Sequence, residues 1–147
     1  MDGFVTRVLP ATPDAYAPDG SEVRLLCRLA GGSMAHFRLP PGACSTAVVH
    51  RTVGELWFVV AGEGELWRSR EGVVETVALR PAVAVSIPVG TSFQFRAAAS
   101  SEVAVVAVTM PPWPGDDEAV AVPGAWPSQT GSTSSPTRTT PGSTTVA

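Results

Sequence analysis

The sequence predicts an all-β protein of the sandwich or barrel class. Between residues 22 and 110, short segments alternate apolar and polar side chains with a period of two residues. Gly or Pro stands at nearly every break between these segments. No segment in this range keeps a 3.6-residue apolar period for longer than about two turns. Short, evenly spaced strands with such turns are typical of sandwiches and barrels.

The first two strands are expected at 22–30 and 33–39. In the first, Val23 and Leu25 alternate with Arg24, which is the pattern of a half-buried strand. A Gly-Gly turn at 31–32 leads into the second, and Pro-Pro-Gly at 40–42 ends it.

The middle of the predicted sheet is formed by strands at 48–52 and 55–61. Residues 56–61 are all apolar, which predicts burial on both faces of that strand. One face carries Glu55, Trp57 and Val59, and the other carries Leu56, Phe58 and Val60. If the first face borders a pocket, the second needs a cover, either a neighbouring sheet or another subunit.

The remaining strands and the flanking segments follow from the same signals. Strands are expected at 65–70, 73–79, 83–87, 91–97 and 102–110. The domain organisation is then an N-terminal arm (1–21), a barrel (22–112), a strap containing Pro and Trp (113–127), and a disordered tail (128–147). The tail is rich in Ser, Thr and Gly and cannot offset its ordering entropy by burial.

Composition limits the class of protein. The chain has 147 residues, is 44% hydrophobic and carries a formal net charge of −3, which fits one domain with a core. Its basic residues are all Arg and are scattered, so no nucleic-acid partner is expected.

No stretch is long and apolar enough for a membrane span or a secretory signal, which predicts a cytoplasmic protein. Cys27 and Cys44 are expected to be reduced thiols.

His50, Glu55 and Gly62, followed later in the chain by Pro88-Val89-Gly90, form a pattern that resembles the two signature motifs of the cupin superfamily. His50, Glu55 and Gly62 match the second histidine, the glutamate and the glycine of the first motif. Pro88-Val89-Gly90 matches the Pro-x-Gly of the second. The resemblance covers residues 22–112 and is to the small single-domain bacterial cupins. It implies a cupin-type jelly-roll β-barrel.

The metal-binding part of the motif is incomplete. The resemblance implies three histidines and one glutamate as metal ligands, but Val48 stands at the first histidine place and Phe93 at the third. Two ligands remain, whereas a catalytic metal site usually has three or more from the protein. We therefore expect no tightly held cofactor. Divalent metal binding at His50 and Glu55 through an unforeseen third ligand is the alternative.

His50 and Glu55 are the predicted catalytic residues. A carboxylate that opens an apolar strand is expected to be desolvated, which raises its pKa, and the histidine beside it is expected to be stabilised as a cation. The predicted substrate pocket consists of Val48, Trp57, Val59, Phe93 and Phe95. An alternative without catalysis is that Glu55 bonds His50 or an arginine and only joins two strands.

Three functions remain open at this point. The favoured one is an enzyme that isomerises, epimerises or cyclises a small metabolite, such as a sugar or a polyketide, by acid–base chemistry. The second is a metal-dependent cupin, a dioxygenase or isomerase, with atypical ligands. The third is a non-catalytic cupin that binds a small molecule. A small-molecule ligand and a homodimer are the expected partners.

Overall fold

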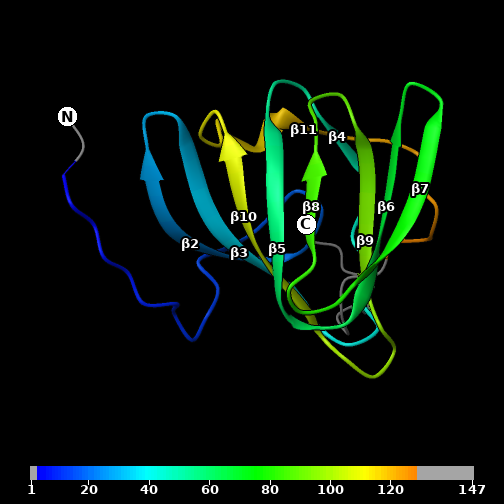
Figure 1. The fold of residues 1–147 in the computed structure, drawn as a ribbon, viewed down its shortest axis with the longest axis horizontal. Helices are drawn as coiled ribbons and strands as arrows, with labels where there is room; N and C mark the ends of the chain where they lie inside the picture. Colours follow the sequence, from blue (N-terminus) through cyan, green and yellow to red (C-terminus); the bar gives the residue numbers. More distant parts are fainter. Residues whose placement is uncertain (1–2, 129–147) are drawn as a thin grey trace, which may run out of the picture.

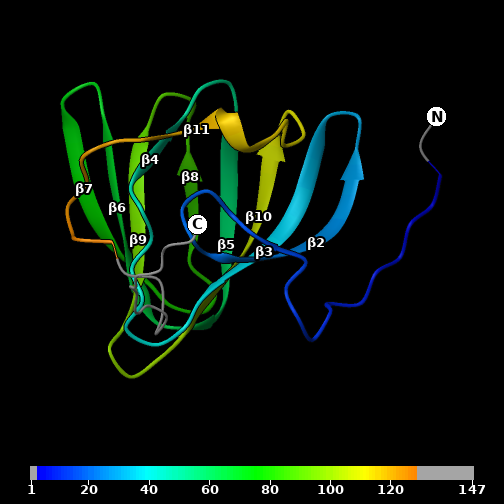
Figure 2. The ribbon, with the colours of Figure 1, turned by 180° about the vertical axis from the view of Figure 1, so that it is seen from behind.

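Two antiparallel sheets form the protein, as the sequence predicts (Figures 1 and 2). The computed structural model describes residues 3–128, so the predicted tail lies outside the described residues except for Ser128. One sheet has the strand order β1-β2-β3-β10-β5-β8, and the other has β11-β4-β9-β6-β7. The strands are β1 (Ala15–Tyr16), β2 (Glu22–Leu29), β3 (Gly32–Leu39), β4 (Val48–His50), β5 (Gly54–Gly62), β6 (Gly64–Arg70), β7 (Val73–Leu79), β8 (Ala84–Ile87), β9 (Ser92–Ala97), β10 (Val103–Met110) and β11 (Ala119–Ala121).

Every strand expected from the sequence is present within a few residues of its expected bounds. Two strands lie outside the range expected for the barrel. β1 comes from the predicted arm and pairs with β2, and β11 comes from the predicted strap and pairs with β4. A short 3-10 helix, η1 (Asp116–Glu118), precedes β11. Both ends of the chain therefore contribute to the sheets. No helix within residues 3–128 is long and apolar enough to cross a membrane.

The core lies between the two sheets and is built from the inward side of each strand. Val59, Leu66, Phe95 and Val105 are almost completely buried there. On β5, Glu55, Trp57 and Val59 point inward, as the alternation predicts.

The opposite face of β5 is exposed in this chain. Leu56, Phe58 and Val60 keep 50%, 48% and 43% of their surface accessible. Within the described chain no other sheet packs on the outer side of the six-stranded sheet, so of the two predicted covers the neighbouring sheet is not found and another subunit stays a prediction.

Two turns of the predicted motifs require glycine. Gly62 has φ +75°, and a Cβ there would lie 1.8 Å from the carbonyl oxygen of Glu102. Gly90 has φ +81° in the turn after β8. Both positions favour a residue without a Cβ, and at Gly62 the close approach of the backbone excludes any other.

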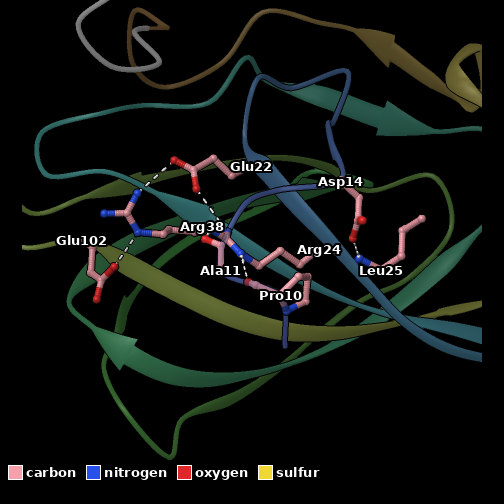
Figure 3. A network of polar contacts seen from close by, with 8 residues as sticks. All are labelled: Pro10, Ala11, Asp14, Glu22, Arg24, Leu25, Arg38 and Glu102. Atoms are coloured by element: carbon pink, nitrogen blue, oxygen red, sulfur yellow. Dashed lines mark hydrogen bonds and ion pairs between the residues drawn. The ribbon is translucent and has the colours of Figure 1, made fainter. Parts of the chain in front are cut away.

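The N-terminal arm is held against β2 at several points, including the pairing of β1 with β2 and two hydrogen bonds from Arg24. Arg24 of β2 donates from Nε to the carbonyl oxygen of Pro10 and from Nη2 to that of Ala11, at 2.9 and 3.0 Å (Figure 3). The chain before Pro10 runs along the outside of the barrel beside β2 (Figures 1 and 2), where Cys27 Sγ lies 3.8 Å from the carbonyl oxygen of Val5. Phe4 and Val8 on this part are fully or largely exposed.

Candidate functional site

A cavity of about 190 Å³ lies between the two sheets. Most of the side chains that line it are apolar or aromatic. Its polar lining includes two buried carboxyl groups, an exposed carboxyl group and a histidine, which are Glu55, Asp19, Asp116 and His50. No arginine lines this cavity in the part of the chain that the structure describes.

The structure brings most of the predicted site residues together around this cavity. β4 supplies Val48 and His50, β5 supplies Glu55 and Trp57, and β9 supplies Phe93 and Phe95. These strands belong to different sheets, so the site spans the barrel interior. Val59 is fully buried in the core and is not among the residues that line the cavity.

Aromatic rings fix the position of the histidine and of the tryptophan. The His50 ring meets Phe93 edge-on at 5.0 Å between centroids and Trp113 at 4.9 Å. Trp57 packs against Phe95 in the same manner at 5.0 Å. Edge-to-face contacts of this kind are the preferred geometry of aromatic pairs, so the walls of the cavity are well defined.

Glu55 is a buried acid whose pKa is raised to about 7. Burial is the main cause, because only 4% of the residue is accessible and the charged form loses its hydration. The Asp19 carboxyl raises the pKa further, while a hydrogen bond that Trp57 Nε1 donates to Glu55 Oε1 at 2.6 Å lowers it. The predicted rise in the pKa of Glu55 is confirmed.

His50 is held in its neutral form. Burial lowers its pKa to about 4, and the nearby Glu118 carboxylate only partly opposes this effect. Its Nδ1 atom lies 3.4 Å from Glu55 Oε2 but forms no hydrogen bond with the described residues. The expectation that Glu55 would stabilise the histidine cation is wrong, because desolvation outweighs the attraction and Glu55 itself is protonated below about pH 7.

Two residues of the site are not evident from the sequence pattern. Asp19 lies in the turn before β2, where Asp-Gly indicates only a turn, yet it is buried and lines the cavity. Its Oδ1 accepts hydrogen bonds from the backbone N–H and the hydroxyl of Ser21, and burial raises its pKa. Trp113 is expected in a surface strap, but its ring reaches His50.

Glu118 attaches the C-terminal segment to the site. Its carboxylate accepts hydrogen bonds from the backbone N–H groups of Thr52 and Val53 and from the Thr52 hydroxyl. Thr52 and Val53 follow β4 closely in the chain. The three hydrogen bonds, here called the Glu118 clamp, therefore hold η1 and Trp113 close to His50. Glu118 is itself 4% exposed.

The donor set does not fit the cupin metal centre. Val48 and Phe93, at the two substituted ligand places, are paired in register between β4 and β9 and offer only hydrocarbon to the cavity. Within residues 3–128, no three His, Cys, Asp or Glu side chains are grouped so that they would hold a metal ion. The chemistry of this cavity is therefore assigned to protein side chains alone.

Comparison with known proteins shows the fold. No protein-family profile matches the chain. No curated protein sequence is significantly similar to it.

Solved structures of similar fold include BH2720 from Bacillus halodurans (17% identity, TM-score 0.58), with 63% of this chain and 72% of that chain covered. KdgF from Halomonas sp. is 22% identical with a TM-score of 0.56, over 66% of this chain and 82% of that one. The capsular polysaccharide assembling protein CapF from Staphylococcus aureus is 14% identical with a TM-score of 0.63, over 80% of this chain but 32% of CapF. These similarities show that the chain has the predicted cupin-type jelly-roll fold.

Proposed function

We propose that the protein is an enzyme that moves a proton on a small organic molecule, in an isomerisation, epimerisation or cyclisation. The observation that supports it best is Glu55, a carboxyl group with a pKa of about 7 that lines a cavity beside a neutral histidine. A general base works best when its pKa lies near the operating pH. An acid and a neutral imidazole are also a known combination for removing a proton next to a carbonyl group.

The proton would move between carbon and Glu55. The Glu55 carboxylate takes a proton from the carbon next to a carbonyl, and the electron pair of that C–H bond becomes a carbon–carbon double bond. The carbonyl oxygen takes up the negative charge, which an imidazole N–H of His50 stabilises by a hydrogen bond. Glu55 then returns a proton to the same or a neighbouring carbon, and in D2O this proton is a deuteron once the carboxyl group has exchanged with solvent. No co-reactant is needed for this balance.

The arrangement around Glu55 supports this role. The hydrogen bond from Trp57 fixes one carboxylate oxygen and leaves the other beside His50. The aromatic walls make the cavity less polar than bulk water, which strengthens electrostatic interactions inside it.

Hydrogen–deuterium exchange of a model ketone tests the proposal. The probe is 2-indanone, a neutral, ring-sized ketone, and the loss of its methylene signal in D2O is followed by proton NMR. We expect the wild-type protein to accelerate exchange over buffer, with a rate that rises with pH and levels off above about 7. Glu55→Gln should lower the protein-dependent rate by about 100-fold or more, the usual contribution of a general base.

The controls separate catalysis from folding. Glu75→Gln changes an exposed carboxylate on β7 and should leave the rate unchanged. Circular dichroism must show that both variants are folded. The proposal is wrong if wild-type protein exchanges the ketone at the buffer rate, or if folded Glu55→Gln keeps the wild-type rate.

A further inference from the structure

The charges of the protein are divided between its outside and its cavity. The chain contains no lysine. Six arginines in the described residues pair with carboxylates away from the cavity: Arg7 with Asp14, Arg24 and Arg38 with Glu22, Arg68 with Glu75, Arg70 with Glu71, and Arg96 with Glu65. Figure 3 shows one such network on β2 and β3. These positive side chains thus lie away from the cavity, and all of them except the buried Arg24 reach the outer surface.

The carboxyl groups of the cavity have no such partner. In residues 3–128, no arginine forms an ion pair with Asp19, Glu55 or Asp116. Asp19 and Glu55 are 8% and 4% exposed, so both would be carboxylates with little hydration. The cost of an ionised carboxylate in this setting is why burial raises the pKa of both groups, and a bound cation would stabilise their ionised forms.

His50 supplies an open hydrogen-bonding position next to Glu55. Its Nδ1 is buried and has no hydrogen-bond partner among the described residues, and both His50 and Glu55 are lining residues of the cavity. Nδ1 lies 3.4 Å from Glu55 Oε2, so an ammonium nitrogen to one side of this pair can lie about 2.8 Å from both atoms. An ammonium group has three N–H donors and can bond to the carboxylate and to the neutral imidazole together.

The size and walls of the cavity define the rest of the ligand. A cavity of about 150 Å³ is large enough for benzene, and this one is about 190 Å³. Trp57, Phe93 and Trp113 place aromatic rings around it. Aromatic faces attract organic cations, and their edges pack well against a further ring.

We propose that the cavity binds a small protonated amine with one ring-sized apolar body, whose ammonium group contacts Glu55 and His50. The inference rests on the proposed function in so far as both place a ligand in this cavity, and it adds the charge class of ligand that Glu55 and His50 can hold. Anionic ligands of the same size are disfavoured wherever Glu55 is ionised, because no basic side chain among the described lining residues would compensate the repulsion.

Three probes of matched shape test the charge class: benzylamine, benzyl alcohol and benzoate. Binding is measured by isothermal titration calorimetry and by quenching of tryptophan fluorescence at pH 8. We expect benzylamine to bind at least tenfold more tightly than benzyl alcohol, because hydrogen bonds to a charged group are stronger than neutral ones. Benzoate is expected to bind most weakly. Equal or tighter binding of benzoate overturns the proposal, as does failure of benzylamine to bind.

Single substitutions test whether the preference for amine over alcohol comes from the carboxyl groups of the cavity. Glu55→Gln should weaken benzylamine about tenfold or more and change benzyl alcohol by less than about threefold. Glu75→Gln, on the outer surface, should change neither. Asp19→Asn is a second variant for the case that Glu55→Gln does not fold, and it should also weaken only the amine. An equal loss for amine and alcohol would show a change of shape and contradict the charge-based inference.

The pH dependence gives a further readout. The groups that face Glu55 are Trp57 on its own strand, His50 on β4 and Asp19 before β2, with Glu118 close to His50. Benzylamine affinity should increase from pH 5.5 to pH 8 as Glu55 ionises, whereas benzyl alcohol affinity should not. A benzylamine affinity that stays constant over this range would contradict the role of Glu55.

The binding and exchange experiments together distinguish a failure of the amine inference from a failure of the proposed catalytic function. Exchange of the neutral ketone without amine selectivity would leave proton transfer intact and overturn this inference. Selective amine binding without ketone exchange would retain the inference about charge and reject the catalytic role.

Discussion

Glu55 and His50 affect the stability of the protein in opposite directions as the pH changes. The folded-state pKa of Glu55 is about 7, above its ordinary value of 4.5. As the pH rises from 4.5 to 7, the unfolded state loses this proton before the folded state does, so stability falls. The pKa of His50 is about 4, below its ordinary 6.5, so stability falls when the pH decreases from 6.5 to 4.

The two single variants should separate these effects. We predict that Glu55→Gln becomes more stable than wild type as the pH rises from 4.5 to 7, by on the order of 3 kcal/mol at the upper end. His50→Gln should gain a similar amount relative to wild type as the pH falls from 6.5 to 4. Urea denaturation of the three proteins across this range measures both differences. Differences that do not vary with pH would contradict the assigned pKa shifts.

The positions of Glu55 and His50 could be predicted from the sequence, but the protonation state of His50 could not. Their spacing to Gly62 is enough to place them in the barrel, and the alternation on β5 and β9 places Trp57 and Phe93 with them. The protonation of His50 could not be predicted, since it depends on how fully neighbouring segments bury the ring. The burial of Asp19 beside the cavity could not be predicted either, because Asp before Gly indicates only a turn.

At the scale of elements, the strands were predictable because each buries one face and so keeps a period of two. β1 and β11 have two and three residues, which is too short for a period to be recognised. Their pairing depends on the neighbouring strands β2 and β4 and not on their own composition. The position of Trp113 over His50 depends in the same way on a distant contact, the Glu118 clamp.

We predict that Glu118→Ala destabilises the protein by about 3 kcal/mol, because it leaves the N–H groups of Thr52 and Val53 and the Thr52 hydroxyl without their acceptor. The Trp113 contact to His50 should also loosen, which a red shift of tryptophan emission would report. Chemical denaturation measures the first effect.

Asp117→Ala is the matched control for this clamp. It removes a neighbouring carboxylate that is exposed in the structure, and it should cost less than about 0.5 kcal/mol. Equal effects of the two substitutions would show that the clamp does not hold the segment.

At the scale of the whole molecule, two exposed apolar features have no partner within the described chain. One is the outer face of β5, with Leu56, Phe58 and Val60 exposed. The other is the arm before Pro10, where Phe4 and Val8 are 109% and 85% exposed. We propose that both are covered in a two-fold symmetric homodimer, in which the arm of each subunit packs on the outer sheet face of the other.

Light scattering coupled to gel filtration checks this assembly. We predict a dimer for the wild-type protein at micromolar concentration and a monomer for Phe58→Glu and for Phe4→Glu, because each places a charge in an apolar interface. Val73→Glu, at an apolar position on β7 of the other sheet that is 69% exposed, should remain a dimer. A wild-type monomer would contradict the proposal.

The division of charge between surface and cavity has a consequence for how the protein responds to ionic strength. Dissolved salt screens exposed charges beyond about 8 Å at physiological concentration, but it acts much less on groups that it cannot surround. The arginine pairs of the outer surface should therefore weaken in concentrated salt, while the field of Asp19 and Glu55 inside the cavity persists. Preference for a cation would then be a property of the interior, independent of the net charge of −3 that the molecule presents to its surroundings.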